Sequence, residues 1–133
     1  MNKQPPRLIQ KSILSKGRFY FQSHLEIINS FFPVRLTPKE IEFLSAFMNK
    51  EGELVKEGRF NTIIRKKVKE ELGLSDGGMG NYVKSLKEKG AIKEDSEGKL
   101  DVNPILFPNK KEQYYQFKLE KETTTTNYEE NKK

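Results

Sequence analysis

The side chains with the clearest chemical potential in this sequence are cationic rather than catalytic. Between Asn61 and Lys93 there are eight Lys or Arg residues and four Asp or Glu residues, a local excess of four positive charges. Such a concentration favours an anionic partner, although lysine-rich helices are also ordinary solvated surface. Nucleic-acid contact and a plain solvated face are therefore the two interpretations of this segment.

Other chemistry is largely excluded by composition. The chain has no cysteine and one histidine, His24, so disulfides, thiolate sites and multi-histidine metal cages are ruled out. A lone histidine in a first helical turn is more typical of a solvent-facing or cap-adjacent position than of a ligand or general base. Gly77-Gly78-Met79-Gly80 is followed by Asn81 rather than by Lys and Ser or Thr, unlike a phosphate-binding loop. We expect no enzyme, cofactor or metal.

The whole chain has 133 residues, 25 of them basic and 19 acidic, for a net charge of +6. No stretch approaches the roughly 20 apolar residues of a membrane span, and the N-terminus lacks the apolar segment of a secretory signal. A soluble, cytoplasmic protein is expected. Only 34% of the residues are apolar, below the ~45–50% typical of globular domains, so long polar tails are expected.

Charge and composition divide the chain into three parts. Residues 1–18 are predicted to be a basic flexible arm, 19–119 a single domain, and 120–133 a disordered tail with four consecutive threonines. The arm is either a phosphate-contacting extension or a frayed, solvated terminus. Its cations are Lys3, Arg7, Lys11, Lys16 and Arg18.

The first half of the domain predicts two helices. Ser23 and Glu26 fit a capping box, so a helix is expected from Ser23 until Pro33 stops it, after a short strand at Phe19–Phe21. Thr37-Pro38-Lys39-Glu40 is a stronger start signal and predicts a helix to about Met48. Leu54-Val55 is expected to form a short strand.

The second half predicts a helix pair followed by strands. One helix runs from Asn61 or Thr62 to Gly73, and the next from Asp76, capped by Ser75, to about Lys89. The period then changes from 3.6 to 2, which predicts a hairpin with strands at 91–93 and 99–103 and a last strand over Tyr115–Leu119.

Helical geometry sorts the side chains of this pair. At 100° per residue, Arg65, Lys66 and Lys69 share the face of the first helix that points away from its apolar stripe. On the second helix the predicted exposed face holds Gly77, Asn81, Lys84, Ser85 and Glu88.

The order helix, helix, strand, strand carries a resemblance to a known superfamily. Its carriers are Leu36–Glu40, Val68–Ser75 and the run Tyr82–Ile92, in which a leucine, basic residues, Gly90 and an aliphatic residue lead from helix to strand. From 36 to 103 the chain resembles a winged helix-turn-helix domain of MarR-type and related bacterial and phage proteins. Leu100–Pro104 is more loosely similar to a strand of plasmid and phage replication initiators. The resemblance implies a mainly α fold with a small antiparallel β wing (α+β).

The resemblance also implies a function and roles for residues. The helix from Asp76 would enter the major groove of double-stranded DNA, with Asn81, Lys84 and Ser85 facing bases. Arg65, Lys66, Lys69 and Lys87 would contact phosphates. A transcriptional regulator or replication-initiation factor, associated with the nucleoid when bound to DNA, is the expected function. The alternative is a protein-interaction or phage structural module that does not bind DNA.

Two features depart from this pattern, and a third feature bears on whether the protein is a dimer. Gly77, Gly78 and Gly80 crowd the first turn of the proposed recognition helix, where each costs about 0.5–1 kcal/mol relative to alanine. The hairpin tip is acidic, through Glu94, Asp95 and Glu97, so it would grip phosphates poorly or contact protein. Four aromatic residues outside the 36–103 core suggest either a homodimer or cover for the domain's own back face: Phe19, Phe21, Phe31 and Phe32.

Overall fold

The central element of the fold is a helix that begins where its sequence signal predicts. In the computed structural model, which describes residues 4–123, α2 (Pro38–Met48) has a complete capping box. The Glu40 amide donates to Thr37 Oγ1 at 3.1 Å, and the Thr37 amide donates to Glu40 Oε1 at 2.8 Å. Eight of its 11 residues are buried. Such burial on nearly all sides requires neighbours all round, and α2 contacts α1 (Arg18–Ile28), α3 (Thr62–Leu72), α4 (Asp76–Glu88) and β2 (Leu100–Val102).

The two predicted helices after α2 are confirmed with their caps. Asn61 accepts a hydrogen bond from the Ile64 amide at the start of α3, and Ser75 accepts one from the Gly78 amide at the start of α4. Gly73 ends α3 in the left-handed region, at φ 66°, a conformation that costs glycine little because it has no Cβ. Local capping chemistry therefore fixes the short turn between the helices.

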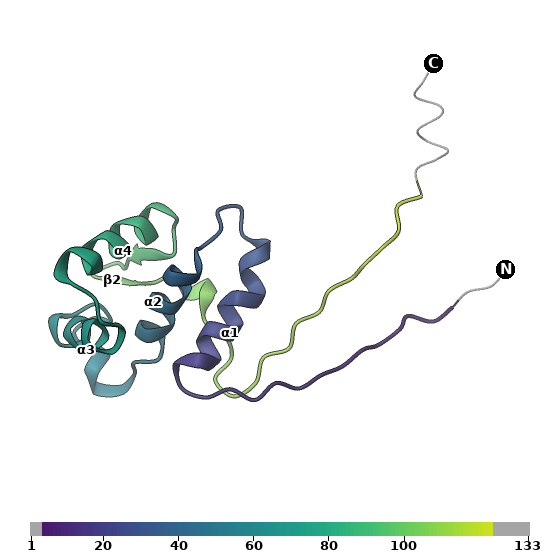
Figure 1. Ribbon diagram of the computed structural model, residues 1–133, viewed down its shortest axis with the longest axis horizontal. Coiled ribbons are helices and arrows are strands. Elements are labelled where there is room, and N and C mark those ends of the chain that lie inside the picture. Colours follow the sequence, from purple (N-terminus) through teal and green to yellow (C-terminus); the bar gives the residue numbers. More distant parts are fainter. Residues whose placement is uncertain (1–3, 124–133) are drawn as a thin grey trace, which may run out of the picture.

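The predicted hairpin is also confirmed. β1 (Ile92–Glu94) pairs antiparallel with β2, with Ile92 opposite Val102. Arg59 fastens β2 to the end of α2, because its Nε donates to Asp101 at 3.0 Å and its Nη1 donates to the Phe47 carbonyl at 3.0 Å. The described chain is thus mainly helical with one small antiparallel sheet, an α+β architecture (Figure 1).

The prediction for the start of α1 was wrong. Phe19–Phe21 is not a strand, and Ser23 does not cap a helix, since α1 already begins at Arg18 and Ser23 lies in its middle. The helical conformation places the Phe21 ring edge-on against Phe107, with centroids 6.4 Å apart. This tertiary contact outweighs the β preference of three consecutive aromatic residues.

The connections around α2 differ in part from expectation. After α1 the chain makes a 3₁₀ turn, Asn29–Phe31, and the Asn29 amide group closes the following loop through hydrogen bonds with the Leu36 backbone. Leu54-Val55 is not a strand, because Gly52–Val55 forms a second 3₁₀ turn. Two adjacent apolar residues show no hydrophobic period, so their sequence does not distinguish a strand from a turn. A third 3₁₀ turn, Pro104–Leu106, follows the hairpin.

The predicted last strand is wrong as well, although its period-2 alternation has a structural meaning. No strand forms over Tyr115–Leu119 within the described residues. The first part of the segment packs on the α1 region instead, where Tyr115 contacts His24 of α1 and Phe117 stacks on Phe31 of the 3₁₀ turn at 5.2 Å. Tyr115 and Phe117 thus face helical structure rather than a sheet, whereas Leu119 is 99% exposed.

The same contact corrects the expectation for His24. This residue is buried, with 5% of its surface exposed, rather than solvent-facing. Its Nδ1 shares a hydrogen bond of 2.5 Å with the Tyr115 hydroxyl. Burial lowers the pKa of His24, because the charged imidazolium loses hydration inside the protein. A structural role in holding the C-terminal segment follows from this geometry.

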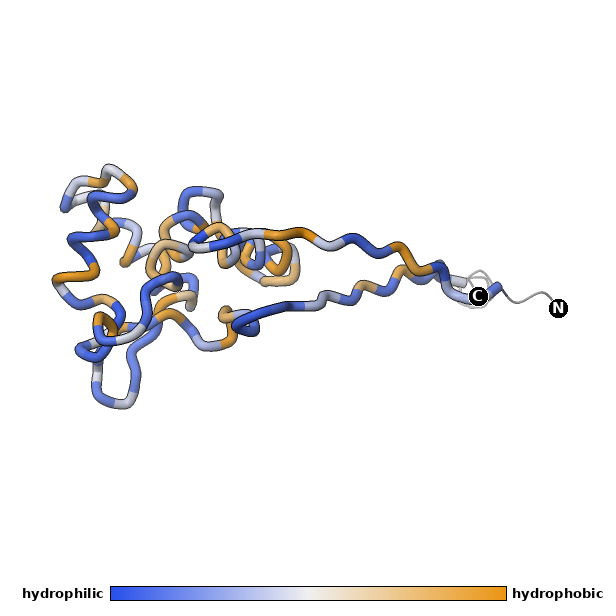
Figure 2. The backbone as a smooth tube through the Cα atoms, turned by 90° about the horizontal axis from the view of Figure 1, so that it is seen from below, coloured by the Kyte–Doolittle hydropathy of each residue, from blue (hydrophilic) through white to orange (hydrophobic). Residues whose placement is uncertain are grey.

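The two chain ends leave the folded part in the same direction. Residues 4–16 and 109–123 form neither helix nor strand, and both run away from α3 and α4 (Figures 1 and 2). The arm cation Lys3 and most of the predicted tail, 124–133, lie outside the described residues. The arm therefore extends away from the basic helix pair.

The four aromatic residues that suggested a dimer divide into two pairs. Phe21 and Phe32 are partly buried against the core, as expected of cover for the domain's own back face. Phe19 and Phe31 remain 54% and 60% exposed.

Candidate nucleic-acid interface

The α3–turn–α4 unit holds the predicted site residues on a defined scaffold. Leu74 donates its amide to the Lys69 carbonyl at 2.9 Å, which closes α3. Lys69 Nζ lies 2.7 Å from Asp76 Oδ1, so an ion pair spans the turn and lowers the pKa of Asp76. Opposite charge next to a carboxylate favours its ionised form. Lys69 is thus partly engaged within the protein, and its availability for an external phosphate is reduced.

The exposed face of α4 carries two of the three residues predicted to face bases. Asn81 and Lys84 are exposed, and neither side chain makes a hydrogen bond or ion pair within residues 4–123. Met79, Val83 and Leu86 point the other way and are buried. Asn81 and Lys84 therefore lie together on the free side of the helix, as the helical geometry predicts.

A hollow of about 350 Å³ lies beside this face, between α3 and α4. Arg65 lines it from α3, and Lys84 and Lys87 line it from α4. Gly80 forms part of the wall, and a Cβ atom at this position would meet nothing within 4 Å. The three cations outnumber the one carboxylate of the lining, Glu88, so the hollow favours an anion. Val83 and Glu88 complete the lining.

The other residues predicted to contact phosphates differ in their surroundings: Arg65 and Lys66 on α3, and Lys87 on α4. Arg65 is fixed by a hydrogen bond of 2.8 Å from its Nε to the Phe60 carbonyl, which orients the guanidinium and leaves its other donors for an external acceptor. Lys66 is exposed. Lys87 is 4.0 Å from Glu94, a loose pair at the surface.

Ser85 is the predicted site residue that the structure places elsewhere. Its hydroxyl donates to Glu40 Oε2 at 2.6 Å, so it faces α2 rather than the free side of α4. Ser85 lies at the edge of the predicted face, and helical geometry alone does not say which neighbour packs at that edge. It is therefore unavailable to a base and joins α4 to α2.

Glu40 is the polar centre that sequence reasoning missed. It is 4% exposed and also accepts a hydrogen bond from Lys89 Nζ at 2.6 Å. Burial by itself would raise the pKa of Glu40, but the hydrogen bonds from Lys89, Ser85 and Thr37 outweigh it and lower the pKa. The sequence contained part of the signal for this cluster. The predicted capping box includes Glu40, and Ser85 and Lys89 are four residues apart, on one edge of a helix.

The hairpin tip is acidic and internally organised. Asp95 Oδ1 accepts hydrogen bonds from the Glu97 and Lys99 amides at 2.8 and 2.9 Å. These bonds lower the pKa of Asp95. Asp95 is thus a turn-forming residue, and the tip adds negative charge near α4.

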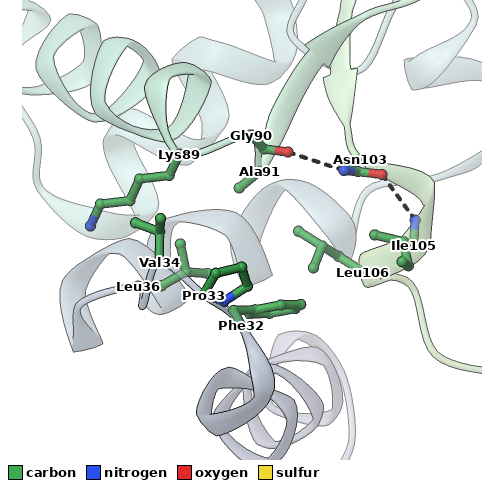
Figure 3. A pocket seen from close by; sticks show the side chains of 10 residues that line it. All are labelled: Phe32, Pro33, Val34, Leu36, Lys89, Gly90, Ala91, Asn103, Ile105 and Leu106. Carbon is green, nitrogen blue, oxygen red and sulfur yellow. Dashed lines mark hydrogen bonds between the residues drawn. The ribbon is translucent and has the colours of Figure 1, made fainter.

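Asn103 ties the base of the hairpin to the end of α4 (Figure 3). Its Nδ2 donates to the Gly90 carbonyl at 3.1 Å, and its Oδ1 accepts from the Ile105 amide at 3.2 Å. The residues beside it line an apolar groove of about 220 Å³ between the hairpin base and the loop at 32–36. Asn103 thus holds the orientation of the hairpin relative to α4.

Comparisons with protein-family models, curated proteins and solved structures find no match for this chain. No helix in the described part is long and apolar enough to cross a membrane. Residues 4–123 also hold no group of three or more His, Cys, Asp or Glu residues placed to bind a metal ion.

Proposed function

We propose that this protein is a non-enzymatic double-stranded DNA-binding protein whose α3, α4 and hairpin act as a winged helix-turn-helix. The observation that carries the proposal is the hollow between α3 and α4, which Arg65, Lys84 and Lys87 line, on the helix that also exposes Asn81. Cations beside a free amide suit a ligand that combines phosphates with base edges. A regulator or replication-initiation factor of bacterial or phage type is the corresponding class of protein.

In the proposed complex α4 lies in the major groove. A carboxamide at Asn81 is able to pair with N6 and N7 of adenine, and Lys84 with O6 and N7 of guanine. Arg65, Lys66 and Lys87 contact the flanking phosphates and supply affinity without sequence preference. Because Ser85 is bonded to Glu40, the proposed base-reading set is reduced to Asn81 and Lys84.

The proposal predicts different consequences for the side chains that face bases and for those that contact phosphates. Replacing Asn81 with alanine should remove about 1–3 kcal/mol of discrimination at one base pair while leaving non-specific binding unchanged. The double substitution Lys66→Ala/Lys87→Ala should weaken binding to every duplex and reduce the slope of log K against log salt by about 2. Fluorescence anisotropy on selected and random duplexes at several salt concentrations measures both effects.

Lys110→Ala/Lys111→Ala is the matched control, because it removes the same charge from exposed positions outside the helix pair. Binding should then stay close to that of the unaltered protein. Equal weakening by both double variants would show that only net charge matters, and the assignment of the site to α3 and α4 would be lost.

The acidic hairpin tip favours a second candidate, a protein-docking module. Glu94, Asp95 and Glu97 are all exposed and would repel phosphates. A docking module should bind no duplex at any salt concentration, so the same titration separates the two functions.

A further inference from the structure

The C-terminal segment has the composition of a strand but lacks a strand partner. Tyr115, Phe117 and Leu119 alternate with polar residues, and Tyr and Phe are enriched in strands. Tyr115 and Phe117 lie against His24 and Phe31 of the α1 region. Within the described residues, no backbone N–H or C=O group of 115–119 makes a hydrogen bond. The segment is an extended edge with free backbone groups, and it is held against the α1 region at Tyr115 and Phe117.

Such an edge is a template for pairing with another extended chain, because its donors and acceptors are regularly spaced and free. The C-terminal segment runs away from the helices (Figures 1 and 2), and residues 116–123 are exposed, so a second chain has access to them. Leu119 is 99% exposed. An apolar side chain so fully exposed gains from being covered.

The distribution of exposed apolar residues favours a second copy of this chain as the occupant. Most of the large exposed apolar residues in the described part lie on the terminal segments, around α1 and near Pro104–Leu106, and none lies on α4: Leu8, Ile9, Ile13, Leu14, Phe19, Phe31, Val34, Ile105, Tyr114, Phe117 and Leu119. A two-fold contact brings the same patch together from both subunits, so each apolar surface covers the other.

Charge complementarity selects the register. In an antiparallel pair centred on Leu119, Lys118 of each copy lies directly opposite Glu120 of the other, and the two Leu119 side chains meet on the axis. Within one chain Lys118 and Glu120 are 3.1 Å apart, but their side chains are 76% and 71% exposed, so this pair is worth little. Pairing replaces it with two symmetric cross-strand contacts.

We propose that residues 117–121 of two copies pair as antiparallel strands about a two-fold axis at Leu119 and form a homodimer. This interface is separate from the proposed DNA-binding face, and it does not depend on the proposed function. The other occupants of the edge, a strand from an unrelated protein or the arm of the same chain, are outcomes of the test below.

The test is a charge exchange measured by sedimentation equilibrium without nucleic acid. Lys118→Glu and Glu120→Lys should each weaken self-association about tenfold, because each places two like-charged pairs across the axis. An equimolar mixture of the two variants should associate as the unaltered protein does, since every cross-strand pair is then of opposite charge. The double variant Lys118→Glu/Glu120→Lys should also recover.

Lys110→Glu is the matched control, because it changes charge by the same amount outside the proposed ladder, and it should leave association unchanged. Slow amide hydrogen exchange over 117–121 at high concentration is the expected second signature. A protein that stays monomeric up to about 100 μM overturns the proposal. So does a mixture that associates no better than the single variants, since the contact then lies elsewhere or belongs to another partner.

Discussion

Glu40 shows how a single buried residue can hold a surface helix in place. It lies in the first turn of α2 and accepts hydrogen bonds from Ser85 and Lys89 on α4. A buried carboxylate is tolerated only when its lone pairs are satisfied. Here the partners are a hydroxyl, an ammonium group and a backbone amide. The orientation of α4, and so of Asn81, depends on a residue outside the candidate interface.

The first residue-scale prediction concerns this cluster. Glu40→Gln should lower the free energy of unfolding by about 2 kcal/mol, and Ser85→Ala by about 1 kcal/mol, because each removes a charge-assisted hydrogen bond. Chemical denaturation at neutral pH measures both values. Asn81→Ala is the control and should fall within about 0.5 kcal/mol of the unaltered protein, because its side chain is exposed. If Ser85→Ala changed base preference without changing stability, its assignment to Glu40 would be wrong.

The second residue-scale prediction uses the only histidine of the chain. Burial lowers the pKa of His24 below its ordinary value of 6.5, so the unfolded chain binds a proton more readily than the folded one. Stability should therefore decrease as the pH falls below about 6.5 and level off below the folded-state pKa. The pKa of Glu40 is also lowered, and its contribution is lost only at more acidic pH, below its ordinary value of 4.5.

The titratable groups next to the His24 ring are Tyr115 and, through Tyr115, Tyr20. Burial raises the pKa of Tyr115, so its phenol is neutral in this window. His24→Gln should abolish the loss of stability between about pH 7 and 5. Unfolding free energies compared at these two pH values provide the measurement, and an unchanged decrease in the variant would assign the titration to another group.

At the scale of elements, α4 combines good caps with an unfavourable first half. Ser75 caps it and Asp76 adds a favourable charge at its N-terminus. Gly77 and Gly80 then weaken it, and a Cβ atom at either position would meet nothing within 4 Å. No contact within the described protein therefore requires glycine there, which is consistent with close approach of an external partner to the helix.

The prediction at this scale is that one substitution in α4 raises the stability of the protein and weakens its binding to DNA. Gly80→Ala should stabilise the protein by about 0.5–1 kcal/mol, because alanine has the higher helix propensity and meets no clash. If DNA approaches the helix at this point, the same substitution should weaken duplex binding. Thermal unfolding and anisotropy on one preparation measure the two effects. Greater stability with unchanged affinity would mean that the DNA does not pass close to Gly80.

At the scale of the whole molecule, the basic hollow is separate from most of the exposed apolar residues. The hollow is formed by α3 and α4, whereas most of the large exposed apolar residues lie around α1 and on the terminal segments. The proposed strand pairing would leave both basic faces free, so a dimer should bind duplexes with two half-sites in preference to one. Affinities for single and inverted-repeat sites, compared between the unaltered protein and Lys118→Glu, test this link. Equal preference in both would show that DNA binding does not use the dimer.

Local signals in the sequence were sufficient to predict α2, α3, α4 and the hairpin. Their signals are short-range: the caps Thr37, Asn61 and Ser75, the left-handed Gly73, and a clear change from helical to strand period. The position of Asn81 and Lys84 on the exposed side of α4 follows from the same helical period. These features require no knowledge of what packs against each element.

Tertiary structure alone decided the course of α1, the fate of the C-terminal segment and the role of Ser85. Each depends on a contact distant in sequence: Phe21 with Phe107, His24 with Tyr115, and Ser85 with Glu40. Periodicity states which side of a segment is apolar or polar, but it does not name the element that covers that side. For this reason Tyr115, in an alternating segment predicted to be a strand, packs on a helix, and a serine predicted to face DNA is hydrogen-bonded to a buried glutamate.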